Sequence, residues 1–125
     1  MDAVDRLAGI MARLRGPDGC PWDRKQTPAS LRTYLLEEAY EVAQAIDDGD
    51  WDELRGELGD LLLQVVFLSR IAEEAGHFDL AQVAESISDK LVRRHPHVFA
   101  QGEASSVSEV WKSWEEIKRG EGRGR

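Results

Sequence analysis

The fold is decided by residues 27–75, which read TPASLRTYLLEEAYEVAQAIDDGDWDELRGELGDLLLQVVFLSRIAEEA. Thr27 is a favoured N-cap residue and Pro28 is favoured at the first helical position. These two residues predict that a helix begins here and continues to about Ile46. Asp47-Asp48-Gly49 then interrupts the pattern and predicts the end of this helix.

A second helix follows directly. Asp50 with Glu53 resembles a capping box, which is typical of a helix start. The helix is predicted to end near Ala75, because Gly76 is a typical C-terminal stop. So short a connection makes the two helices antiparallel neighbours.

Apolar residues at helical spacing predict the buried face of each helix. In the first helix Glu38 falls inside this stripe, and in the second Glu57 borders it. The stripe residues of the first helix are Leu31, Leu35, Val42 and Ile46. Those of the second helix are Leu54, Leu58, Leu61, Val65 and Leu68.

Two acidic pairs lie on these helices. Glu38 and Glu41 are three residues apart, and so are Glu57 and Asp60, so each pair shares one helix face. Counted outward from the turn, both pairs lie at similar heights, and four carboxylates are expected to converge. Buried like charges repel, and a divalent cation such as Mg²⁺ or Mn²⁺ would remove this repulsion. The plainer alternative is a solvated acidic face.

The rest of the chain predicts three further helices. One spans about Asp2 to Arg15, one starts at Asp79 and ends before Pro96, and one starts at Ser106. Their apolar stripes are Val4, Leu7, Met11 and Leu14 in the first, Leu80, Val83, Ile87 and Leu91 in the second, and Trp111, Trp114 and Ile117 in the third. A loop is predicted from Gly16 to Gln26.

No alternating strand pattern competes with these helices. The sequence therefore predicts an all-α bundle of about five helices with a metal site between two antiparallel core helices. We expect one domain over residues 1–119 and a flexible tail over 120–125.

The net charge of −8, from 24 acidic and 16 basic residues, argues against a stable nucleic-acid partner. Cys20 is the single cysteine, and Met1 to Arg15 lacks the apolar core of a signal peptide, so the cytoplasm is expected. The run Leu61–Leu68 is too short to span a membrane. It is apolar on nearly every face, which favours a homodimer or homotetramer.

The acidic motifs resemble a known signature. Glu37-Glu38-Ala39-Tyr40-Glu41 followed by Glu57-Leu58-Gly59-Asp60 resembles that of the all-α nucleoside triphosphate pyrophosphohydrolases. The strings GCPWD at 19–23 and DKLVRRHPHVF at 89–99 resemble the MazG branch specifically. The resemblance implies Mg²⁺-dependent hydrolysis of a nucleoside triphosphate to the monophosphate and pyrophosphate, as in house-cleaning of the nucleotide pool. It implies that Glu38, Glu41, Glu57 and Asp60 bind the metal.

The same resemblance implies roles for other residues. Glu37 either binds a second Mg²⁺ or orients the attacking water. Lys90 and Arg94, which share a helix face, would assist catalysis by holding phosphate oxygens. The residues expected to contact the nucleotide are Trp22, Lys25, Gln26, Arg93, Trp114 and Lys118. The plainer alternatives are surface charge for the basic residues and packing for the two tryptophans.

Other functions remain as alternatives. One is a non-catalytic helical interaction module with a structural ion, and another is hydrolysis of a phosphoribosyl nucleotide or of one deoxynucleotide. A ferritin-like di-iron site needs Glu-x-x-His on two helices, and only Glu74-Ala75-Gly76-His77 has that form. The sequence G-x-x-x-x-G-K-[ST] of P-loop proteins is absent.

Overall fold

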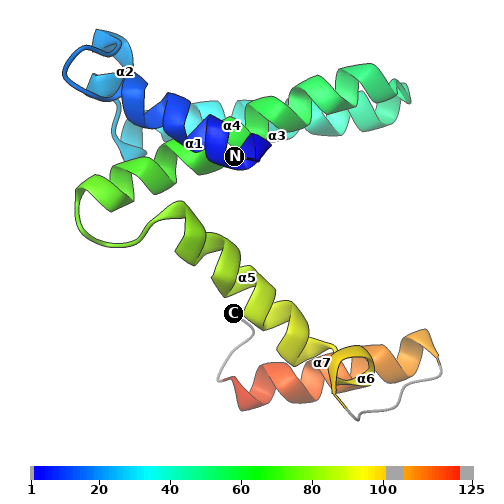
Figure 1. Cartoon of the computed structure of the whole chain (residues 1–125). Helices are drawn as coiled ribbons and strands as arrows, with labels where there is room; N and C mark the ends of the chain where they lie inside the picture. Colours follow the sequence, from blue (N-terminus) through cyan, green and yellow to red (C-terminus); the bar gives the residue numbers. More distant parts are fainter. Residues whose placement is uncertain (1, 101–105, 122–125) are drawn as a thin grey trace. The chain divides into compact units, whose positions relative to one another are not determined.

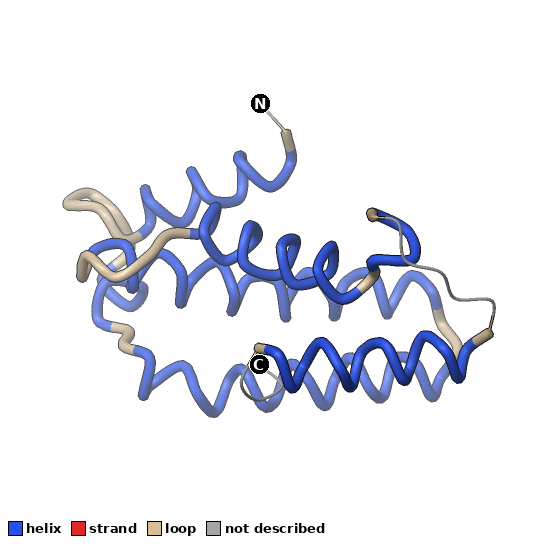
Figure 2. The backbone as a smooth tube through the Cα atoms, turned by 90° about the horizontal axis from the view of Figure 1, so that it is seen from below, coloured by secondary structure: helices blue, strands red, loops and turns tan. Residues whose placement is uncertain are grey.

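The computed structural model describes residues 2–100 and 106–121, and within them it contains helices and no strand (Figure 2). The all-α prediction is confirmed. In chain order the helices are α1 (Ala3–Leu14), α2 (Pro21–Lys25), α3 (Pro28–Asp48), α4 (Trp51–Glu74), α5 (Leu80–Arg94), α6 (Pro96–Phe99) and α7 (Val107–Gly120).

Five of these helices are the predicted ones, and α2 and α6 are additional. The loop predicted up to Gln26 is wrong for Pro21–Lys25, where Pro21 starts one helical turn. Pro96 similarly starts the short α6. Both segments are too short to show apolar periodicity, so the sequence pattern does not reveal them.

The chain forms two compact units, one up to Leu80 and one from Ala81 onward. The first contains α1 to α4, and the second contains most of α5 with α6 and α7. The single domain over residues 1–119 stays a prediction. Residues 122–125 of the predicted tail lie outside the described residues, whereas Gly120 ends α7 and Glu121 is its C-cap. No described helix is both long enough and apolar enough to cross a membrane.

Helices α3 and α4 form an antiparallel hairpin whose ends are capped as predicted (Figure 1). The Thr27 side chain accepts a hydrogen bond from the Ser30 amide, and the Ser30 side chain accepts one from the Thr27 amide. Gly49 ends α3 with a φ of 68°, a conformation that glycine adopts without steric cost. Asp50 then accepts from two amides of the first turn of α4.

The core of the first unit lies between α1, α3 and α4. It consists of Met11, Leu31, Val66 and Phe67, each at most 2% exposed. Along α3 the least exposed positions recur every three or four residues, and Glu38 is among them as predicted; these positions are Leu31, Leu35, Glu38, Val42 and Ala45.

Several predicted core residues are exposed. Ile46 is 61% exposed, because the buried spacing continues to Ala45 and leaves Ile46 at the end of the hairpin. Leu58 is 47% exposed, and the same correction applies to Val4, Ile87 and Leu91. Periodicity identifies an apolar face, but only the tertiary contacts decide how much of that face is covered.

Arg15 anchors the segment between α1 and α3. Its guanidinium donates to both oxygens of Glu74 at 2.8–3.2 Å, to the Asp23 carbonyl at 2.6 Å and to the Gln26 carbonyl at 3.2 Å. The Cζ atom of this guanidinium also lies 5.7 Å from the centre of the Phe67 ring. This buried cation therefore ties α1 and α4 to the segment that contains α2.

Replacing Arg15 by Met should lower the free energy of unfolding by about 2–4 kcal/mol, because Glu74 and two carbonyls lose a charged donor. Urea unfolding at pH 7 measures this loss. Arg55→Ala is the control, since Arg55 pairs with Asp52 on the surface and should change stability by less than about 0.5 kcal/mol. An equal loss in both variants would contradict the anchoring role.

The anchor also predicts a pH dependence. The hydrogen bonds from Arg15 hold the pKa of Glu74 below its ordinary 4.5. A carboxyl with a lowered pKa in the folded state stabilises the protein above about pH 4.5, and this contribution is lost as the pH falls through the folded pKa. The wild-type protein should lose this part of its stability on acidification, and Arg15→Met should lose less, because Arg70 still contacts Glu74.

Candidate functional site

Three acidic side chains meet at the seam between α3 and α4. Carboxylate oxygens of Glu38, Glu57 and Asp60 all lie within 4.8 Å of one another. Glu38 comes from the middle of α3, and the other two come from successive turns of α4. Antiparallel packing brings them together because both helices reach this height at a similar distance from the turn.

The other two predicted acids lie beside this cluster. Glu41 and Glu37 are exposed on α3 and are not among the three residues whose oxygens converge. Both are nevertheless close enough for their charges to raise the pKa of Glu38. Desolvation by burial raises the pKa of Glu38, and the charges of Asp60, Glu57, Glu41 and Glu37 raise it further, in that order. Desolvation also raises the pKa of Glu57, with Glu41 and Asp60 adding to it.

This donor set suits a hard divalent cation. Carboxylate oxygens are the ligands that Mg²⁺ and Mn²⁺ prefer, and a doubly charged ion would offset the repulsion that raises these pKa values. Gly56 and Gly59 have no other atom within 4 Å of a Cβ built on them, so this stretch of α4 is open. Within the described residues, the arrangement fits a metal ion bound from two helices.

Trp22, Lys25 and Gln26 lie in a segment that follows Gly19, where the backbone passes very close to the backbone at Leu14. A Cβ on Gly19 would lie 2.1 Å from the Leu14 carbonyl oxygen, so only glycine fits there. Gln26 donates to the Trp22 carbonyl at 3.0 Å and accepts from Ser30 at 2.8 Å. Lys25 is exposed. The local structure thus holds Gln26 through its own hydrogen bonds.

Trp22 packs against one aromatic side chain from each helix of the hairpin. Its ring meets Phe67 edge-on at 6.4 Å and Tyr34 edge-on at 5.9 Å between centres. It is still 50% exposed, so it both packs on the core and presents a surface. Tyr34, 40% exposed and one helical turn before Glu38, belongs to this aromatic surface but was not singled out by the sequence.

The predicted basic residues lie in the second unit. Arg93 donates to the Glu121 carboxylate, and Arg94 donates to the same carboxylate at 3.0 Å. Hydrogen bonds from these two arginines hold the pKa of Glu121 below its ordinary range. A polar cavity of about 380 Å³ adjoins this pair and is lined by Ser86, Asp89, Lys90, Arg93 and Glu121. Lys90 and Arg93 therefore border one cavity.

Trp114 belongs to an aromatic cluster in the same unit. Its ring lies 5.2 Å from that of His95 and 5.7 Å from that of Trp111. Lys118 is partly buried one turn further along α7. These contacts match the packing alternative for Trp114, while its predicted contact with a nucleotide stays a prediction.

Helix α4 contains a further buried polar residue that the motif does not include. Gln64 is 7% exposed on α4, one turn after Asp60. It is the one polar residue in the apolar run Leu61–Leu68, and that isolation is the signal by which it can be found.

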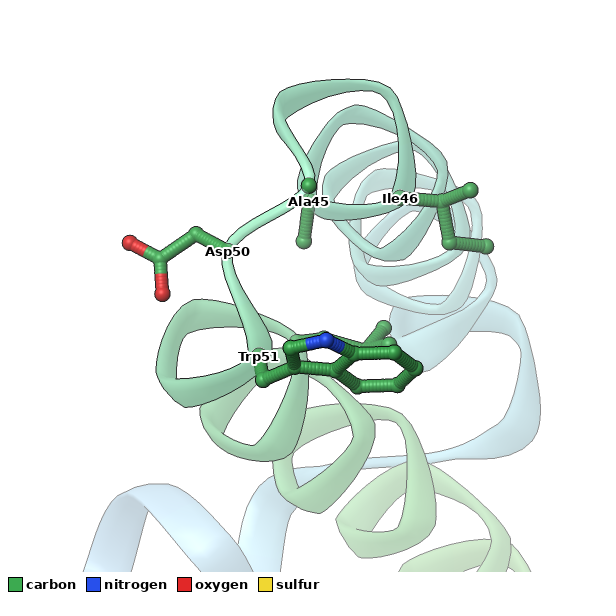
Figure 3. Close-up of a pocket in the computed structure, with 6 residues that line it drawn as sticks. Ala45, Ile46, Asp50 and Trp51 are labelled. Carbon is green, nitrogen blue, oxygen red and sulfur yellow. The ribbon is translucent and has the colours of Figure 1, made fainter.

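A second hollow lies at the turn of the hairpin (Figure 3). It has a volume of about 280 Å³ and is lined mainly by apolar side chains, including Ala45, Ile46, Trp51 and Leu54. Figure 3 shows the Asp50 carboxylate pointing away from the hollow. With Trp51 81% exposed, the hollow is an apolar surface rather than a polar site.

Comparison with known proteins gives consistent relatives. The model of the MazG nucleotide pyrophosphohydrolase domain matches residues 26–99. A protein named nucleoside triphosphate pyrophosphohydrolase from Escherichia coli (strain K12) is 57% identical over 119 residues, covering 94% of this chain and 45% of that protein. A Thermotoga maritima protein named nucleoside triphosphate pyrophosphohydrolase/pyrophosphatase MazG is 51% identical over 114 residues, covering 91% of this chain and 43% of that protein.

One solved structure is similar along most of both chains. The crystal structure of a mazG-related protein from Thermotoga maritima superimposes with a TM-score of 0.76 at 31% identity, covering 92% of this chain and 98% of that one. By contrast, this chain spans less than half the length of the two named sequence relatives.

The acidic cluster predicts an effect on stability. Replacing Glu38 by Gln removes one of several mutually repelling charges, so the metal-free protein should melt a few degrees higher. Adding Mg²⁺ should raise the melting temperature of the wild-type protein, because binding stabilises the folded state, and should do so less in the variant. Thermal melts with EDTA and with Mg²⁺ measure both effects. A lower melting temperature of Glu38→Gln in EDTA would show that this side chain stabilises the fold instead.

Proposed function

The chain belongs to the MazG nucleotide pyrophosphohydrolase family, and from this membership we propose that it hydrolyses nucleoside triphosphates to the monophosphate and pyrophosphate. The convergence of Glu38, Glu57 and Asp60 within 4.8 Å carries the proposal. The family relationship indicates the reaction. The cluster provides carboxylate ligands for the divalent cation that this reaction requires.

We assign the metal-binding role to Glu38, Glu57 and Asp60, with Glu41 as a fourth ligand from the next turn of α3. Mg²⁺ fits these oxygen donors, and Mn²⁺ is the alternative. When bound, the cation offsets the negative charge of the triphosphate and of the departing pyrophosphate. Glu41 already influences the pKa of Glu38 and Glu57, which supports its place in the set.

The remaining residues bind and orient the reactants in this proposal. Glu37, exposed beside the cluster, orients the water that attacks the α phosphorus in line. Lys90 and Arg94 stabilise negative charge on the phosphates. Because Arg93 and Arg94 both donate to Glu121, substrate phosphates compete with this carboxylate for the two guanidinium groups. Trp22, Lys25, Gln26, Trp114 and Lys118 contact the nucleotide.

Pyrophosphate release in oxygen-18 water tests the proposed reaction. The label should appear in the nucleoside monophosphate, and EDTA should abolish release. Glu38→Gln and Asp60→Asn should also abolish it while circular dichroism stays helical. Full activity in excess EDTA, or label in the pyrophosphate, would overturn the proposal. Ribo- and deoxynucleoside triphosphates and a phosphoribosyl nucleotide in the same assay separate the substrate alternatives.

Two variants test the supporting roles in that assay. Glu37→Gln and Lys90→Ala should each lower turnover by about a hundredfold to a thousandfold, the usual effect of removing one charge-stabilising group. Arg55→Ala, on the exposed surface of α4, is the control and should leave turnover unchanged. No loss in either of the first two variants would remove these residues from the mechanism.

We also propose that the protein acts as a homodimer or homotetramer. Large apolar side chains remain exposed along the hairpin, and burial between subunits would remove them from water. They are Leu36 (45% exposed), Tyr40 (76%), Ile46 (61%), Trp51 (81%), Leu58 (47%) and Leu62 (40%). A second copy supplies the same apolar surfaces and a closed symmetry.

Light scattering should therefore give a multiple of the 14.0 kDa chain mass. Tyr40→Glu should lower the measured mass, because it places a charge on the exposed apolar face of α3. Glu41→Gln, next to it on the same helix, is a control for the mass measurement alone. A wild-type monomer that stays fully active at high dilution would contradict the proposal.

A further inference from the structure

Gln64 has a buried side-chain oxygen without a hydrogen-bond partner among the described residues. It lies on α4, is 7% exposed, and its Oε1 atom makes no hydrogen bond within the described residues. Nearly all buried polar atoms in folded proteins are hydrogen-bonded, so an unpaired one needs a physical reason. An apolar residue of similar size at this buried position would avoid that cost.

The place of Gln64 relates it to the acidic cluster. It follows Asp60 by one helical turn and Glu57 by two turns, so the three side chains lie along one side of α4. Helical side chains lean toward the N-terminus of their helix. The Gln64 amide therefore extends over the turn that carries Asp60.

The missing partner must be a hydrogen-bond donor. Ionised carboxylates only accept hydrogen bonds, so Glu57 and Asp60 cannot satisfy Oε1. A hydrated divalent cation can, because Mg²⁺ keeps several of its waters when protein carboxylates bind it, and those waters are donors. The acidic cluster and the unpaired amide thus point independently to the same occupant.

We propose that Gln64 is a positioning residue for the cation site: its Oε1 accepts a hydrogen bond from the hydration shell of a divalent cation held by Glu38, Glu57 and Asp60. The inference rests on the metal site of the proposed function and extends it by one residue. Residues that hydrogen-bond to the ligands of a metal, without binding the metal themselves, typically contribute a factor of about 10–100 to metal affinity.

The test uses the full chain and two properties, thermal stability and metal affinity, of which the first should increase and the second should decrease. Gln64→Met keeps an unbranched side chain of similar volume and removes the amide. The metal-free variant should melt higher by about 4 °C, since an unpaired buried group is gone. Its dissociation constant for Mn²⁺, measured by electron paramagnetic resonance, should rise by about 10–100-fold.

Two further variants make the result specific. Gln64→Glu keeps an acceptor oxygen at this position and should retain Mn²⁺ affinity, while its added charge lowers the melting temperature of the metal-free protein. Ser69→Ala is the matched control, because Ser69 is also buried on α4 but its hydroxyl donates to the Val65 carbonyl at 2.7 Å. It should leave Mn²⁺ affinity unchanged.

The outcomes separate this inference from the function on which it rests. If Glu38→Gln loses Mn²⁺ binding and Gln64→Met binds as the wild-type protein does, Gln64 has no role at the site and the metal site stands. A fall in both melting temperature and affinity for Gln64→Met would make Gln64 a structural residue and overturn the inference. If the wild-type protein binds no Mn²⁺, both proposals are wrong.

Discussion

The antiparallel packing of α3 on α4 is the constraint on which the site depends. It sets three carboxylates from two helices at one height, where burial and the charges of Asp60 and Glu57 raise the pKa of Glu38. Leucine side chains between the two helices would stabilise the hairpin more. In this protein, Glu38 instead occupies the same face of α3 as Leu31 and Ala45. Such a departure from core chemistry is typical of a functional site, and the favourable contacts that offset it lie elsewhere in the unit.

Those contacts are concentrated where α1, the α2 segment and α4 meet. Arg15 satisfies two carbonyls and one carboxylate there, and the absence of a side chain on Gly19 lets the backbone pass against Leu14. The string GCPWD at residues 19–23 thus has a structural cause besides any role in binding. The same arrangement places Trp22 against Phe67 and Tyr34. Tyr34 lies one helical turn from Glu38.

The second unit has a different balance between polar and apolar contacts. Its arginines already donate to Glu121, and its aromatic side chains pack on one another, while Ile87, Leu91 and Trp111 stay about half exposed. Burial of these half-exposed apolar side chains would add a further stabilising term. The same reasoning underlies the proposed association of the hairpin with a second copy.

The sequence by itself determined the five longer helices, the caps of the hairpin and the acidic pairs, because these depend on neighbours three or four residues away. It identified Glu38 as an acid within an apolar stripe and Gly49 as a helix end. Tertiary structure alone decided that Ala45 is buried and Ile46 exposed, that Arg15 holds the α2 segment, and that Arg93 and Arg94 share Glu121. It also left Gln64 buried with an unpaired oxygen. These features depend on contacts between residues distant in the chain, for which local spacing carries no signal.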